Sequence, residues 1–104
     1  MTTAPYDPAI NGASMSPSAS LAGQTALVTG GGRGIGRAIA LALGELGAEV
    51  VVNYSNSAAA ADEVVAAITV AGGQAYALQA NVSVEAEVEG LIKTVLERSG
   101  RLDV

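Results

Sequence analysis

Apolar residues follow two alternating patterns along this chain. Short continuous apolar runs predict buried strands over residues 25–29, 48–53 and 75–80. Between and after these runs, apolar residues spaced three and four apart predict amphipathic helices over residues 35–46, from Ser55 or Ser57 to Val70, and over 83–99. The pattern therefore predicts strands and helices in strict alternation.

The predicted helix ends carry recognisable signals. Ser83 is expected to cap the third helix, which has acidic residues near its start and basic residues near its end. Glycines follow the predicted helices at Gly47, Gly72 and Gly100. The first helix has an apolar stripe formed by Ile35, Ile39, Leu43 and Leu46.

The order of elements predicts the fold class. Residues 102–104 resemble the first residues of a fourth strand, and each helix is long enough to cross over between parallel strands. The expected fold is α/β, a doubly wound parallel sheet in a three-layer sandwich that is truncated at the start of the fourth strand. Residues 1–20 contain all three prolines and are expected to form a flexible N-terminal tail.

Composition excludes several kinds of chemistry. Ten acidic residues outnumber five basic ones, and the basic residues are scattered, so a nucleic-acid surface is not expected. The chain has no cysteine and no histidine, which removes disulfides, thiolate chemistry and the usual metal ligands. No apolar stretch approaches the roughly 18 residues of a membrane span, and no secretory signal is evident. The expected location is the cytoplasm.

Five of the seven residues from Gly30 to Gly36 are glycine, at the junction between the first strand and the first helix. A turn alone needs one or two glycines, whereas a phosphate that touches backbone N–H groups at a helix start favours more. The P-loop pattern fails because Arg37 and Ala38 stand where Lys and a hydroxyl are required. The loop of S-adenosylmethionine methyltransferases remains a remote alternative, although its usual acids are missing.

The segment Thr29-Gly30-x-x-x-Gly34-Ile35-Gly36 resembles the glycine loop of the short-chain dehydrogenases/reductases. The likeness runs from Leu21 to the last residue, and residues 29–38 and 51–54 are most similar to 3-oxoacyl-acyl carrier protein reductases. It implies that residues 21–104 are the N-terminal, incomplete part of a Rossmann-like dinucleotide-binding domain. It also implies a homo-oligomer in the full-length protein.

The resemblance assigns cofactor contacts to particular residues. It places the backbone around Thr29, Gly30, Gly32, Gly34 and Gly36 at the pyrophosphate, Ile35 near the cofactor, and Asn81 and Val82 beside the adenine. Many family members have Asp at the position of Asn81, which here is equally well interpreted as a helix-entry residue. The second strand ends in neutral Asn53, Tyr54 and Ser55, and Arg33 lies in the loop. Because an acid there would repel a 2′-phosphate and a guanidinium attracts one, NADP is the expected cofactor.

The family's catalytic Ser and Tyr-x-x-x-Lys are not found in this chain. No tyrosine is followed four residues on by lysine, so we name no catalytic residue, and no metal site. We expect the NADP(H)-binding half of an oxidoreductase that acts on a ketone such as a 3-oxoacyl thioester, inactive as it stands. A non-catalytic nucleotide-binding or interaction module is the alternative.

Overall fold

The computed structural model describes residues 20–104, so the predicted tail, apart from Ser20, lies outside the described residues. Three strands form one parallel sheet in the order β1-β2-β3. The strands are β1 (Thr25–Val28), β2 (Glu49–Tyr54) and β3 (Gln74–Gln79), and the helices that alternate with them are α2 (Gly34–Glu45), α3 (Ala58–Val70) and α4 (Glu85–Ser99). The predicted α/β fold is confirmed, with boundaries that differ by one or two residues.

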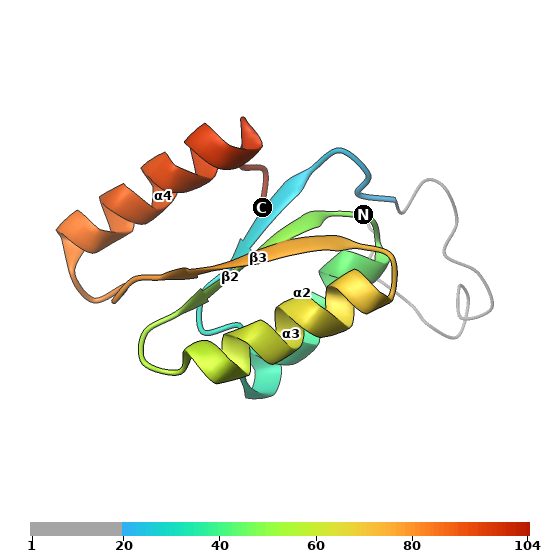
Figure 1. The fold of residues 1–104 in the computed structure, drawn as a ribbon. Coiled ribbons are helices and arrows are strands. Elements are labelled where there is room, and N and C mark those ends of the chain that lie inside the picture. Colours follow the sequence, from blue (N-terminus) through green and yellow to red (C-terminus); the bar gives the residue numbers. More distant parts are fainter. Residues whose placement is uncertain (1–19) are drawn as a thin grey trace.

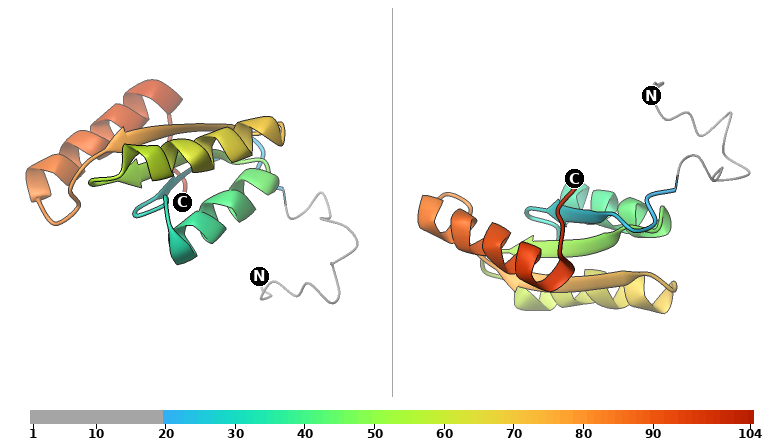
Figure 2. Two further views of the ribbon diagram at one scale, coloured as in Figure 1. Left: turned by 60° about the horizontal axis from the view of Figure 1, so that its bottom comes forward. Right: turned by 90° about the horizontal axis from the view of Figure 1, so that it is seen from above.

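The helices cover both faces of the sheet. Figures 1 and 2 show α2 and α3 side by side on one face and α4 on the other, which is the predicted three-layer, doubly wound arrangement. Because successive strand residues face opposite sides, the apolar run of β2 serves both layers. Val50 and Val52 belong to the core beneath α2 and α3, and Val51 is buried on the opposite face.

The last residues of the chain lie along the edge of β1 that β2 leaves free. Leu27 N–H donates to the Val104 carbonyl oxygen and Asp103 N–H to the Thr25 carbonyl oxygen, both at 2.9 Å. Residues 102–104 are not a regular strand, but these bonds place them where the predicted fourth strand would begin. β1 is therefore an edge strand of the three-stranded sheet, and the end of the chain covers the edge that β2 leaves free.

Helix ends agree with the sequence prediction except at the start of α4, and Gly47 and Gly72 follow α2 and α3 with positive φ as predicted. Ser57 caps α3, since its hydroxyl oxygen accepts a hydrogen bond from Ala60 N–H at 3.3 Å, and Gly100 ends α4 with φ +80°. The predicted Ser83 cap is wrong. Ser83 donates from both its N–H and its hydroxyl to Asn81 Oδ1, at 3.0 and 2.6 Å, so its oxygen does not cap the helix, which begins after Val84.

The apolar stripe of α2 does not face the core along its whole length. Ile35 and Ile39 are 80% and 46% exposed, whereas the buried residue of this helix is Ala40. A small residue at that position allows α2 to lie close to the sheet, so the isoleucines project beside the contact rather than into it. None of the helices within residues 20–104 is long and apolar enough to cross a membrane.

Candidate cofactor-binding site

The glycine loop lies at the carboxyl edge of the sheet, between β1 and α2. Gly31 N–H donates to the Asn53 carbonyl oxygen at 3.2 Å, which fastens the loop to the end of β2. Arg33 occupies the N-cap position of α2 in an extended conformation, and its side chain caps nothing. The first N–H groups of α2 are therefore free of a side-chain cap at the positive end of the helix dipole, where an anion is stabilised.

Backbone angles or close contacts within the chain favour glycine at each of the five positions. Gly30 and Gly34 have φ of +62° and +56°, a region that other residues rarely adopt. A Cβ at Gly31 would lie 3.1 Å from Val52, and one at Gly32 would lie 3.1 Å from the backbone nitrogen of Ala61 in α3. Contacts and backbone angles within the chain therefore account for part of the glycine density of this loop.

Gly36 is the most constrained of the five, because a Cβ there would overlap the Gly30 carbonyl oxygen. At Gly30 and Gly34, by contrast, a Cβ would meet nothing within 4 Å. What points to a ligand is thus the uncapped start of α2, and not the number of glycines.

A pocket of about 320 Å³ joins the loop to the end of β2. Six of its lining residues are predicted site residues: Gly30, Gly32, Arg33, Asn53, Tyr54 and Ser55. The remaining lining residues are not among the predicted site residues: Asn56, Ala60 and Ser57, which the sequence predicts only as a possible cap of the following helix. No lining residue is acidic, and Arg33 is exposed, so the pocket suits an anion by charge.

Asn53 is predicted to contact the cofactor, but its side chain makes hydrogen bonds within the protein instead. It is only 2% exposed, and its side-chain Nδ2 donates to the carbonyl oxygens of Leu78 and Ala80, at 3.3 and 3.2 Å. The side-chain amide is therefore used to join β2 to the end of β3.

Asn81 and Val82 follow β3 and lie outside this pocket. Asn81 Oδ1 already accepts two hydrogen bonds from Ser83, and Asn81 N–H donates to Glu87 Oε1 at 2.8 Å. These contacts favour the helix-entry interpretation of Asn81. Its oxygen has no lone pair left for an adenine amine unless the Ser83 hydroxyl turns away.

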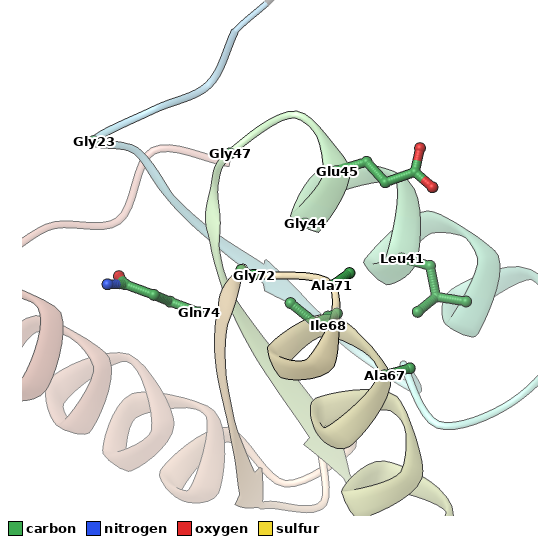
Figure 3. A pocket seen from close by; sticks show the side chains of 11 residues that line it. Gly23, Leu41, Gly44, Glu45, Gly47, Ala67, Ile68, Ala71, Gly72 and Gln74 are labelled. Atoms are coloured by element: carbon green, nitrogen blue, oxygen red, sulfur yellow. The ribbon is translucent and has the colours of Figure 1, made fainter.

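A second cavity, of about 690 Å³, lies at the opposite, amino edge of the sheet. Figure 3 shows Leu41 of α2 beside Ala67 and Ile68 of α3, where these two helices end. Glycines at both helix ends leave the space open, and none of the predicted site residues lines it. This cavity is larger than the pocket beside the loop, but it carries none of the groups predicted to bind phosphate.

Charged and aromatic side chains away from the loop have structural contacts. The Asp103 pKa is lowered because the carboxylate accepts hydrogen bonds from Arg101 and from Thr25 N–H, and the Arg101 pKa is raised in return. Tyr76 shares a hydrogen bond of 2.7 Å with Ser99. Residues 20–104 contain no cluster of side chains suited to hold a metal ion.

Residues 24–104 match the family described as short chain dehydrogenase. Because this match covers most of the chain, the protein belongs to that family, and the methyltransferase alternative is removed. The fold and the glycine loop described above agree with this assignment.

Two individual relatives and one solved structure show the extent of the similarity. The chain is 57% identical over 84 residues to a 3-oxoacyl-[acyl-carrier-protein] reductase of Synechocystis sp., covering 81% of this chain and 34% of that protein. It is 48% identical over 99 residues to a tetrahydroxynaphthalene reductase of Pyricularia oryzae, covering 95% and 35%. A crystal structure of a short chain dehydrogenase from Burkholderia cenocepacia in complex with NADP superposes with a TM-score of 0.76 at 46% identity, covering 80% and 34%. The chain spans about a third of the length of these relatives.

Proposed function

We propose that this chain binds NADP(H) as the cofactor-binding part of an oxidoreductase that transfers a hydride between the nicotinamide and a ketone or alcohol. The observation that carries the proposal is the pocket beside the glycine loop, which combines the cation of Arg33 with a strand end free of acids. An acid at that strand end would instead bind the ribose hydroxyls of NAD. The NADP complex of the Burkholderia relative supports the same cofactor.

In this proposal, different parts of the described chain bind different parts of the cofactor. The backbone from Thr29 to Gly36 would hold the pyrophosphate against the start of α2, with Ile35 exposed beside it. Arg33, Tyr54 and Ser55 would hold the 2′-phosphate, and the segment from Asn81 to Val82 would lie beside the base. When bound, the cofactor supplies the hydride. The described residues bind and orient it.

Within residues 20–104, we find no side chain placed to transfer a proton to the substrate. Tyr76 is engaged with Ser99, and Lys93 lies on the exposed surface of α4. We infer that the acid–base group lies outside this chain, so the 104-residue chain alone should not oxidise NADPH. A homo-oligomeric full-length protein in the cytoplasm belongs to the same proposal, as does the absence of nucleic-acid and membrane partners.

Two substrate classes are supported by different relatives. The match to the Synechocystis enzyme favours a 3-oxoacyl thioester. The match to the tetrahydroxynaphthalene reductase covers 95% of the chain and so reaches well into its first twenty residues, which favours a hydroxylated aromatic ketone as the second candidate. Assaying the full-length protein with both substrates under NADPH decides between them.

Replacing Arg33 tests the cofactor proposal. Arg33→Ala should weaken NADPH binding by about 1.5–3 kcal/mol, roughly 10- to 150-fold, because a hydrogen-bonded charge partner of the 2′-phosphate is lost. NADH binding should change little. Calorimetric titration of the chain with both dinucleotides measures the two affinities.

Arg37→Ala is the matched control. Arg37 lies one turn further along α2, outside the pocket, and pairs only with Glu63 at 4.0 Å on the exposed surface. Its replacement should leave both affinities unchanged. Equal losses of NADPH and NADH in Arg33→Ala would separate Arg33 from the 2′-phosphate, and no binding of either dinucleotide to the chain or to the full-length protein would favour a non-nucleotide module.

A further inference from the structure

Asn53 connects three parts of the proposed site. Its carbonyl oxygen accepts from Gly31 N–H in the glycine loop, and its backbone lines the pocket beside Arg33. Its side chain crosses in the other direction to the carbonyl oxygens of Leu78 and Ala80 at the end of β3.

The orientation of this side-chain amide is unambiguous. Its neighbours within hydrogen-bond distance are the carbonyl oxygens of Tyr54, Leu78 and Ala80, at 3.5, 3.3 and 3.2 Å. Oxygen acceptors can face only the donor nitrogen, so Nδ2 must point toward them. The amide is buried, and no other donor side chain makes these bonds within the described part of the chain.

The bonds continue the connection between β2 and β3 beyond the last strand residue. Ala80 N–H donates to the Tyr54 carbonyl oxygen at 2.9 Å, and Ala80 is itself buried. Asn81 and Val82 follow directly, so the position of this segment relative to the loop depends on how Ala80 is held.

We propose that the Asn53 side chain is a positioning residue that holds the segment from Ala80 to Val82 in place as the base side of the cofactor site. This inference rests on the proposed function, since it assumes that a dinucleotide binds at the loop. The amide touches no reacting atom. It acts through the backbone at the end of β3, and the hydrogen bonds of its side chain reach neither Arg33 nor the glycine loop.

Asn53→Leu tests the proposal, because leucine keeps the branched heavy-atom arrangement of asparagine but removes both donors. Two affinity ratios are measured by titration of the chain. The affinity for adenosine 2′,5′-bisphosphate divided by the affinity for 5′-AMP, called the 2′-phosphate ratio, reports the 2′-phosphate contact. The affinity for 5′-AMP divided by the affinity for ribose 5-phosphate, called the base ratio, reports the base contact. Partial unfolding divides every affinity by the same factor, so it changes neither ratio.

We expect the base ratio to fall from about tenfold or more to less than threefold in Asn53→Leu, with the 2′-phosphate ratio constant within twofold. An affinity for ribose 5-phosphate that is too weak to measure still sets a lower limit on the wild-type ratio. Asn53→Ala, a second variant that also lacks the donors, should give the same pattern. Val51→Ala is the control, because it removes a buried side chain from the same face of β2 without touching Leu78 or Ala80.

A base ratio equal to that of the wild type in both Asn53 variants would overturn the proposal, as would a wild-type base ratio near one. A parallel fall of both ratios would also overturn it, since Asn53 would then act on the whole site. Failure of the proposed function has a different signature, because none of the adenosine ligands would then bind in an Arg33-dependent manner.

Discussion

Gly36 is the position in α2 where the protein's own backbone excludes a side chain. A Cβ there would overlap the Gly30 carbonyl oxygen, and it would lie 2.9 Å from the Gly30 carbonyl carbon and 3.1 Å from Gly31 Cα. Because all three are backbone atoms, no change of rotamer relieves the clash. Even Gly36→Ala must move the loop away from the helix start.

The magnitude follows from two opposing terms. Overpacking of this kind costs about 1–3 kcal/mol, while alanine gains up to about 1 kcal/mol over glycine in a helix. We therefore expect Gly36→Ala to lower the free energy of unfolding by about 0–2 kcal/mol. Affinity for NADPH should fall at least about tenfold, because each displaced hydrogen bond to a charged phosphate contributes about 1.5–3 kcal/mol. Gly36→Val should abolish measurable binding.

Gly90→Ala is the control for this prediction. Gly90 lies within α4, and a Cβ there would meet nothing within 4 Å. The substitution should raise the free energy of unfolding by about 0.5–1 kcal/mol and leave cofactor affinity unchanged. Urea unfolding followed by circular dichroism and calorimetric titration with NADPH provide the two measurements. Stability and affinity in Gly36→Ala that match those of Gly90→Ala would refute the reasoning.

Two further predictions concern the contacts of α4 and of the chain end. Tyr76→Phe removes a hydrogen bond of 2.7 Å to Ser99 and should lower the free energy of unfolding by about 1 kcal/mol in urea titration; an unchanged midpoint would contradict this. Asp103→Asn should lower Tm at neutral pH. Because the Asp103 pKa is lower in the folded than in the unfolded chain, its stabilisation is present above about pH 4 and is lost as pH falls through the folded-state pKa. A difference in Tm between wild type and variant that grows on acidification would be inconsistent with this.

The alternation of strands and helices was predictable because it depends on local patterns. The run from Val50 to Val52 is buried on both faces, as a continuous apolar run in a parallel sheet predicts. Ser57 caps the start of α3 and Gly100 ends α4, both through contacts within a few residues along the chain. Such signals can be recognised without knowledge of the tertiary structure.

The errors have two other physical causes. Gly32 is small because residues of α3, far along the chain, approach it, and no local pattern contains that information. Ser83 does not cap α4 because Asn81 competes for its hydrogen-bond donors, and two adjacent capping candidates cannot be ranked from sequence alone. The roles assigned to Arg33 and Asn81 stay predictions, although Arg33 lies in the pocket where they require it.

The contact between the chain end and the free edge of β1 has a kinetic consequence. Thr25 pairs with Glu49, and Glu49 pairs with Gln74, so each of these pairings closes a loop of similar, moderate length. The bond between Thr25 N–H and Asp103 instead spans 78 residues. Closing a loop about three times longer costs roughly 1 kcal/mol more in chain entropy. During synthesis, β1 emerges before β2 and β3, but the residues that cover its second edge follow only after α4, so the Thr25 and Leu27 amide protons should be among the slowest to gain protection from exchange.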